Sequence, residues 1–146
     1  MDRTDITAII SQKLKLVRTE YNYTQEQMAE VIGVSKKTVV QIEKQRIDCG
    51  WTVAVTICAL FPASSILQNA MGGNPMDLIY LVSNDGVYYK NNTLVNDVLW
   101  WRTESANDDW ILQQNVIHSY YRLVDSNGYI KSMMHSKEQA MKEFTK

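Results

Sequence analysis

The chain has 146 residues, of which 45% are hydrophobic, and its formal net charge is −1. This length suits one ordinary domain or two small ones, and the hydrophobic content excludes a disordered chain. The longest apolar run, residues 53–63, is interrupted by Thr56, and no charged-then-apolar segment precedes the first expected helix. We therefore expect a globular, cytoplasmic protein that is neither secreted nor membrane-spanning.

The charges are distributed unevenly along the chain. Residues 1–61 contain eight Lys or Arg against seven Asp or Glu, whereas residues 62–146 contain seven against nine. Within residues 34–47 four positive side chains are opposed by Glu43 alone. This pattern argues against a protein that binds nucleic acid over its whole surface, and it indicates one local basic patch.

A first helix is expected over residues 6–21, because apolar residues recur there at helical spacing. Asp5 is placed to cap its start. The spacing puts the apolar residues on one face, which we expect to pack into a core. They are Ile6, Ile9, Ile10, Leu14, Val17 and Tyr21.

Two shorter helices follow, joined at Gly33. Thr24 is a good N-cap, and Gln27 three residues later completes a capping box for the first of them. Gly33 tolerates the left-handed backbone conformation that ends a helix sharply. The apolar face of this helix consists of Met28, Val31 and Ile32.

The second of the two helices has Ser35 as its N-cap and is anchored in the core by Val39 and Ile42. Its other faces carry polar and basic side chains that are free to meet a partner: Lys36, Lys37, Thr38, Gln41 and Lys44. Lysine and glutamine side chains suit DNA. Residues 23–46 are therefore predicted to form a helix-turn-helix.

The letters TQEQMAEVIGVSKKTVVQIE resemble the helix-turn-helix of the Cro and lambda-repressor-like (XRE) regulators, and the resemblance covers residues 6–61. The family pattern is matched by Thr24, Gln25, Ala29, Gly33, Val34, Ser35, Ile42 and Glu43. The family also pairs an arginine of the first helix with the late glutamate, which implies a structural Arg18–Glu43 pair. Gln45 stands where many members have a glycine turn, so the recognition helix is expected to run longer here.

The resemblance implies which residues contact double-stranded DNA. The implied set is Gln25, Ser35, Lys36, Lys37, Thr38, Gln41, Lys44 and Arg46. The two lysines at the helix start and Gln41 are implied to reach base edges, because lysine suits the acceptors of guanine and glutamine suits adenine. Gln25 is implied to brace its helix and touch phosphate. Lys44 and Arg46 stand late enough to hold backbone phosphate.

Two further helices complete a five-helix, lambda-repressor-like DNA-binding domain over residues 1–71. Residues 51–61 are apolar on nearly every face, which predicts a buried helix that Pro62 stops. Ser64 or Ser65 is placed to cap a short fifth helix through Met71. The Gly/Pro-dense stretch at residues 72–76 is the predicted linker.

Residues 77–146 are predicted to form a small antiparallel β-sheet domain with a C-terminal helix, so the fold class is α + (α+β). Strands are expected at residues 78–82, 87–89, 98–102, 110–114, 116–124 and 129–133. Asn84-Asp85-Gly86 is a hairpin signal between the first two, and residues 125–128 turn the chain again. Ser136 is placed to cap a closing helix, whose Ala140, Met141 and Phe144 are expected to pack on the sheet.

Aromatic residues are numerous in the predicted sheet. Adjacent pairs such as Trp100-Trp101 and Tyr120-Tyr121 must point to opposite faces of a strand, so one member of each pair is expected to lie off the core. Such aromatic surface needs cover. We expect a dimer interface with Trp100 or Trp101 at its centre, and the alternatives are a small-molecule pocket and a partner protein.

The sequence gives no support to an enzyme. It has no nucleophile–base arrangement, no phosphate-binding glycine loop and no paired carboxylates with a defined frame. Cys49, Cys58, His118 and His135 lack the short spacings of a metal site, and two cysteines are too few for a disulfide framework. We predict reduced cysteines, no metal, no cofactor and no catalytic residue.

These patterns predict a sequence-specific DNA-binding transcriptional regulator of bacterial or phage type, acting as a homodimeric repressor on an inverted-repeat operator. The C-terminal domain is the expected place for self-association or for a small-molecule or protein effector. The alternative is an antitoxin-like interaction protein, whose C-terminal domain binds a partner protein and whose reader autoregulates. A toxin-like neighbouring gene would favour that alternative.

Overall fold

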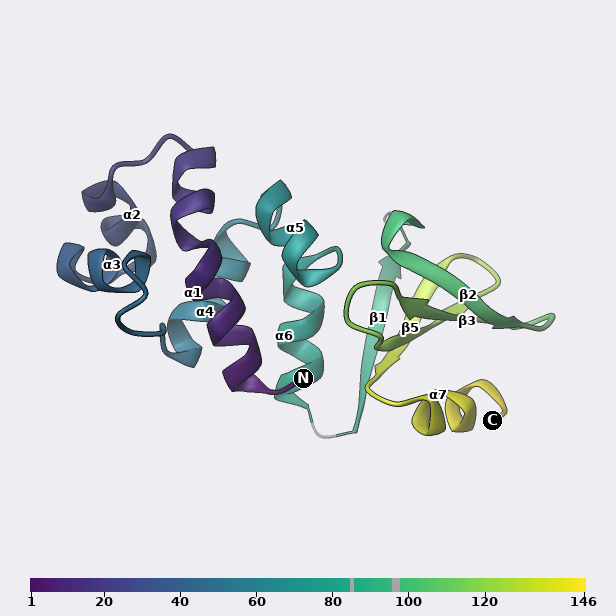
Figure 1. Ribbon diagram of the computed structural model, residues 1–146. Helices are drawn as coiled ribbons and strands as arrows, with labels where there is room; N and C mark the ends of the chain where they lie inside the picture. Colours follow the sequence, from purple (N-terminus) through teal and green to yellow (C-terminus); the bar gives the residue numbers. More distant parts are fainter. Residues whose placement is uncertain (85, 96–97) are drawn as a thin grey trace. The chain divides into compact units, whose positions relative to one another are not determined.

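The computed structural model describes residues 1–84, 86–95 and 98–146, and it divides into two compact units, Met1–Ile79 and Tyr80–Lys146. The division falls inside α6 (Pro75–Ser83), later than the predicted linker at residues 72–76. The N-terminal unit is helical, and the C-terminal unit contains a sheet and a closing helix (Figure 1). None of the described helices is both long and apolar enough to cross a membrane.

The N-terminal unit contains the five predicted helices up to Met71. They are α1 (Arg3–Glu20), α2 (Gln25–Ile32), α3 (Lys36–Glu43), α4 (Trp51–Leu60) and α5 (Ser65–Met71). α1 packs against α3, α4 and α5, and α2 packs against α3 and α4. The apolar stripe of α1 is buried in this core, with Ile6, Ile10, Leu14 and Val17 each fully inaccessible.

Side-chain caps set the ends of α1 and α5. α1 begins earlier than predicted because Asp2 is its N-cap: the Asp2 carboxylate accepts from the Asp5 backbone N–H, and the Asp5 carboxylate accepts from the Asp2 N–H. Asp5 is therefore the second half of a capping box instead of the cap itself. Ser64 caps α5, as one of the two predicted serines, and Gly72 ends it with φ of 78°.

α4 is less buried than its composition predicts. Ala54, Ile57 and Cys58 are buried, but the side chain of Leu60 is 48% exposed. The helix contacts α1 and α2, and apolar side chains away from this contact remain accessible to solvent. The prediction of a helix buried on nearly every face is therefore wrong.

Residues 78–82, predicted as a strand, belong to the helix α6. The Asn74 side chain accepts from the Met76 N–H, and the Asp77 N–H donates to the Asn74 carbonyl, both at 3.0 Å. Pro75 occupies the first helical position, where its missing N–H costs no hydrogen bond, and Asp77 is an acid in the first turn. A short apolar run fits a strand or a helix equally, and here the helix-start residues decide.

The C-terminal unit contains a five-stranded antiparallel sheet in the order β1-β5-β4-β3-β2. The strands are β1 (Val87–Leu94), β2 (Trp101–Ala106), β3 (Trp110–Asn115), β4 (Tyr121–Asp125) and β5 (Tyr129–Met134). β2 to β5 form a meander, and β1 pairs with the outer side of β5. The hairpin expected before residue 87 does not form because its first half is helical, and Asp85 at its turn lies outside the described residues.

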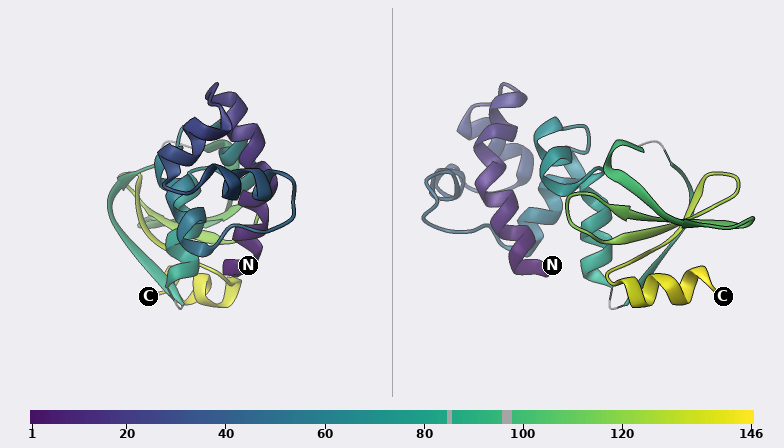
Figure 2. Two further views of the ribbon diagram at one scale, coloured as in Figure 1. Left: turned by 90° about the vertical axis from the view of Figure 1, so that its left-hand side faces the viewer. Right: turned by 45° about the vertical axis from the view of Figure 1, so that its right-hand side comes forward.

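The turn predicted at residues 125–128 connects β4 to β5. The Asp125 carboxylate accepts from the N–H groups of Asn127 and Tyr129, both at 2.9 Å, and Gly128 has φ of 86°. α7 (Lys137–Phe144) begins at the predicted cap, Ser136, and lies against β3, β4 and β5 (Figure 2). The core between helix and sheet consists of Leu112, Tyr121, Leu123, Met134 and Ala140.

The observed strand ends correct the interpretation of the aromatic pairs. Trp100 belongs to the 3₁₀ helix η1 (Val98–Trp100), and Tyr120 precedes β4, so neither pair lies within a single strand. Trp101, Tyr120 and Tyr121 are 7%, 3% and 7% exposed. Trp101 packs edge-on against Tyr120, with ring centroids 5.1 Å apart. Trp101 is thus a core residue, and its predicted place at the centre of a dimer interface is wrong.

Candidate nucleic-acid interface

The turn between α2 and α3 forms as predicted. The Thr24 hydroxyl accepts from the Gln27 N–H at 3.1 Å, and the Gln27 side chain accepts from the Thr24 N–H at 2.8 Å. Gly33 ends α2 with φ of 80°, and the Ser35 hydroxyl accepts from the Thr38 N–H at 3.1 Å. These contacts join residues close in the sequence, so the end of α2 and the start of α3 are set by the segment itself.

α3 has one buried side and one outward side. Val39 and Ile42 are 0% and 1% exposed. Successive side chains of an α-helix are about 100° apart, so the side opposite these two residues carries Lys37, Gln41 and Lys44. Lys37 and Lys44 are exposed and Gln41 is partly exposed. We call these three residues the outward row of α3.

Lys36 is directed toward α2. Its Nζ lies 3.2 Å from Oε1 of Glu26, and both side chains are more than half exposed. An exposed ion pair contributes little to stability, so the ammonium group can exchange this partner for DNA at small cost. Glu26 was missed in the sequence because the two residues meet only when α2 packs on α3.

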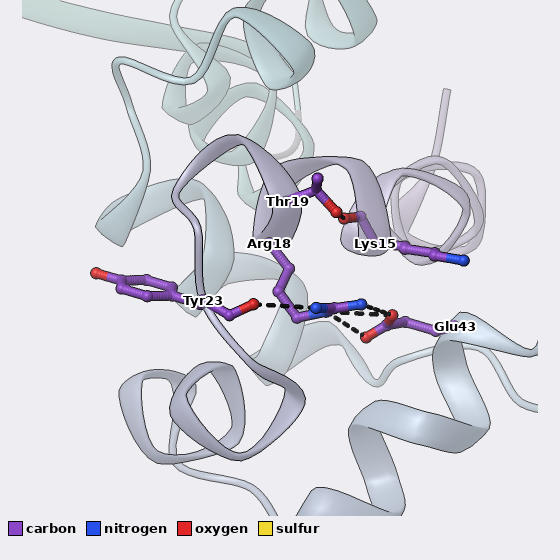
Figure 3. Close-up of polar contacts among 5 residues, drawn as sticks. All are labelled: Lys15, Arg18, Thr19, Tyr23 and Glu43. Carbon is purple, nitrogen blue, oxygen red and sulfur yellow. Dashed lines mark hydrogen bonds and ion pairs between the residues drawn. The ribbon is translucent and has the colours of Figure 1, made fainter.

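The predicted Arg18–Glu43 pair is confirmed (Figure 3). Nε and Nη2 of Arg18 donate to the Glu43 carboxylate at 3.0 and 2.8 Å, and Nη1 donates to the Tyr23 carbonyl at 3.0 Å. The Glu43 side chain is only 4% exposed. The pair joins α1, the chain before α2 and the end of α3, so it holds the recognition helix against the core. It also removes the acidic residue of segment 34–47 from the surface.

The other predicted residues gather around α3. Seven of the eight lie on α3, at its N-cap or within three residues of its end, and Gln25 opens α2, which packs on α3. Arg46 is exposed and Gln25 is partly buried. The hydroxyls of Ser35 and Thr38 lie 2.9 Å apart, so both side chains take part in capping α3.

The comparisons with known proteins agree with this geometry. A helix-turn-helix family model matches residues 14–48. An uncharacterised HTH-type transcriptional regulator of Methanocaldococcus jannaschii is 38% identical over 52 residues, which cover 36% of this chain and 79% of the relative. The uncharacterised HTH-type transcriptional regulator YgzD of Bacillus subtilis is 35% identical, with the same coverage. The chain belongs to the XRE-type helix-turn-helix transcriptional regulators. No solved structure matches it.

The matched segment of this regulator contains α2, α3 and both members of the Arg18–Glu43 pair. It ends at residue 48, before α4 and the whole C-terminal unit. The family assignment therefore rests on the helix-turn-helix, and the C-terminal unit is described by its own structure alone.

The recognition helix α3 is followed by a residue with left-handed backbone conformation. α3 ends at Glu43, and Gln45 has φ of 58°. The Gln45 N–H donates to the Ile42 carbonyl at 2.9 Å, and the Arg46 N–H donates to the Gln41 carbonyl at 3.0 Å, which is the Schellman pattern. The expectation of a longer recognition helix is therefore wrong. The tight turn is kept, with Gln45 in a conformation that glycine adopts more easily.

Val40 is a further candidate contact that the sequence analysis missed. It is partly exposed and, by the helical repeat, lies beside the outward row on α3. Apolar side chains at such positions contact the methyl group of thymine. Its neighbour Val39 is fully buried, as the helical spacing predicted. The same spacing places Val40 away from the core, so the signal for this contact was present in the sequence.

The two cysteines of the regulator are buried free thiols. Burial raises the pKa of Cys58 to about 12, and it also raises the pKa of Cys49. Both groups therefore stay protonated at neutral pH and lack the thiolate that reacts with oxidants or binds metals. This supports packed residues over a redox switch.

Proposed function

We propose that this regulator is a sequence-specific repressor that binds an inverted-repeat operator as a dimer, with α3 in the major groove. The observation that carries the proposal is the outward row of α3. It is basic and accessible, while the opposite side of the helix is anchored in the core and Glu43 is bonded to Arg18. A helix with this division fits the major groove of DNA.

The roles of the individual residues follow from their places. Lys37 and Gln41 lie in the middle of the outward row and are assigned to base edges. Lys36 joins them when it leaves Glu26. Lys44 and Arg46, at and after the end of α3, are assigned to phosphates, which position the helix without reading sequence. Gln25 at the start of α2 is assigned to a phosphate as well.

Base readout is tested by replacing Gln41 with Ala. The variant should lose about 1 to 3 kcal/mol of binding free energy on the operator and should relax the preference at one base pair. Binding to random DNA should change little. Operator fragments are first selected from genomic DNA with the purified protein, and Lys137→Ala in α7 serves as the matched surface control. Equal losses on operator and random DNA would contradict the assignment.

Phosphate contact is tested by replacing Lys44 and Arg46 with Ala, singly. Each variant should weaken binding to all sequences alike, and the slope of log affinity against log salt should fall by about one unit per lost contact. An unchanged slope would show that the side chain does not replace a counterion on the DNA.

The dimer is proposed because one helix-turn-helix reads only a few base pairs and buries too little surface for tight specific binding. The C-terminal unit exposes an apolar group made of Leu99, Val116 and Ile117, which are 78%, 52% and 44% exposed. The Val116 N–H donates to the Trp100 carbonyl at 2.9 Å, so η1 and the turn after β3 bring this group together. We assign it to contact with a second copy of the chain.

Sedimentation of the full chain tests this interface. Leu99→Asp should convert a dimer into a monomer at micromolar concentration and weaken operator binding, because two linked half-sites become independent. Leu16→Asp on α1 is the matched control, since Leu16 is also an exposed leucine, at 49%. Dissociation by the Leu16 variant alone would place the interface in the N-terminal unit.

A further inference from the structure

The C-terminal unit contains a hollow of about 230 Å³ between the sheet and the end of α7. Its apolar walls come from Tyr89 on β1, Trp110 on β3 and Leu123 on β4. An apolar cavity of about 150 Å³ accommodates benzene, so this hollow has room for one ring with a small substituent.

The strand register explains how polar residues reach the hollow. Ser132 on β5 pairs with Tyr89 on one side and with Leu123 on the other, so the three side chains share the face on which α7 packs. After Leu123 the register shifts: Val124 pairs with Ile130, and Lys131 has no opposite residue in β4. This bulge interrupts the alternation of side chains, and Lys131 and Ser132 both line the hollow.

Ser132 has a buried hydroxyl group that makes no hydrogen bond to the described residues. Its side chain is 1% exposed, and its Oγ has no partner among the residues that the structure describes. A hydroxyl that has lost its water without gaining a partner is unfavourable, and buried polar atoms are normally satisfied. A polar ligand atom in the hollow would supply the missing partner.

The charged residues of the lining favour an anion. Lys146 is already engaged: its Nζ lies 2.8 Å from Oε1 of Glu143 and 3.5 Å from the Tyr89 hydroxyl, and these bonds raise the pKa of Lys146. Lys131 is held more loosely, because its Nζ is 4.0 Å from the Asp125 carboxylate and its side chain is 47% exposed. Lys131 is therefore the cation with capacity for a further partner.

We propose that this hollow is an effector site for a small aromatic carboxylate. The ring packs against Trp110 and Leu123, the carboxylate faces Lys131, and a ligand oxygen accepts a hydrogen bond from Ser132. Occupancy of the site changes the affinity for the operator. This last step rests on the proposed function, whereas binding of the ligand itself does not.

Titration of the full chain with benzoate, followed by NMR at the indole N–H of Trp110, tests the site without DNA. Benzamide, which has the same ring and no charge, is the matched probe. Benzoate should shift the Trp110 signal saturably, and benzamide should bind at least about tenfold more weakly. Lys131→Gln should weaken benzoate binding about tenfold, equal to roughly 1.4 kcal/mol. Ser132→Ala should weaken it as well, and Lys137→Gln, which removes an exposed lysine outside the lining, should leave it unchanged.

Three results would overturn the site: no saturable shift at Trp110, equal binding of benzoate and benzamide, or parental affinity in both the Lys131 and Ser132 variants. The regulatory step is measured separately, as operator affinity with and without saturating benzoate. A change in the parent that is absent in Lys131→Gln supports it, and an unchanged affinity in the parent overturns it. If the chain binds no DNA, the proposed function fails while the NMR titration still decides the ligand site.

Discussion

The helices and strands of the two units are defined by contacts of different range along the sequence. In the N-terminal unit, helix ends are set by contacts over three residues, as between Thr24 and Gln27 or between Ser35 and Thr38. In the C-terminal unit, β1 is placed by pairing with β5, as in Val87 opposite Met134. Contacts over a few residues can be predicted from a sequence pattern, whereas a strand partner more than forty residues away cannot.

The same contrast appears in the charged residues. The N-terminal unit contains one nearly buried pair, Arg18 with Glu43, and its lysines lie on the surface. In the C-terminal unit a bulge brings a lysine and a buried serine to one hollow. A helical surface presents its residues by periodicity alone, but a sheet presents them according to register.

Truncation of a core residue tests whether the two units unfold independently. Leu112→Ala, at a residue 1% exposed in the C-terminal core, should cost about 2 to 5 kcal/mol. Hydrogen exchange should show protection lost in β3, β4 and α7 while α1 to α5 keep theirs. Leu14→Ala, in the N-terminal core, should give the reverse. Loss of protection in both units from either change would show that they unfold as one.

Breaking the nearly buried Arg18–Glu43 pair of the N-terminal unit should give the next largest loss of stability. Glu43→Ala should lower the free energy of unfolding by about 3 kcal/mol, because Arg18 is left largely buried without its carboxylate. Chemical denaturation measures this loss. Glu26→Ala, which breaks the exposed pair with Lys36, should cost at most about 0.5 kcal/mol. Similar losses in the two variants would mean that burial does not distinguish these pairs. A Glu43 variant that melts like the parent but fails to bind DNA would place Glu43 in the interface.

The turn after α3 is set by contacts over three to five residues, although it lacks the glycine that is typical of the family. Gln45→Gly should stabilise the protein by about 0.5 to 1 kcal/mol, because a left-handed residue is strained for all types except glycine. Glu30→Gly, in the helical interior of α2, should instead destabilise by about 1 kcal/mol. Thermal melts of the two variants compare them directly, and a loss of stability in Gln45→Gly would contradict the strain.

The smallest effect concerns pH. The hydroxyls of Ser64 and Ser65 donate to Glu20 and lower its pKa below the ordinary value of 4.5. A depressed pKa in the folded state means that Glu20 contributes stability above the unfolded pKa and loses it as the pH falls through the folded value. The difference in melting temperature between the parent and Glu20→Gln should therefore shrink below about pH 4.5. A difference that is constant down to pH 2 would contradict the contribution of these bonds.

Neighbouring residues and the family pattern were enough to predict the helix-turn-helix, its caps, the Arg18–Glu43 pair and the closing helix after Ser136. Sequence patterns also located β3, β5 and the turn at residues 125–128. The base and phosphate contacts of the reader remain predictions, although the structure gathers their residues around one helix.

The burial of each aromatic residue and the start of β4 depend on the tertiary structure. The sequence pattern allowed either face for Trp101, and long-range pairing selected the buried one, since strand ends follow from the partner strand and not from the residues of the strand itself. The run before Asn84 is different, because local helix-start residues made it a helix. The lining of the hollow depends on pairing in the same way. A one-residue shift between β4 and β5 interrupts the alternation at Lys131 and Ser132, which both line the hollow, and no spacing in the sequence records that shift.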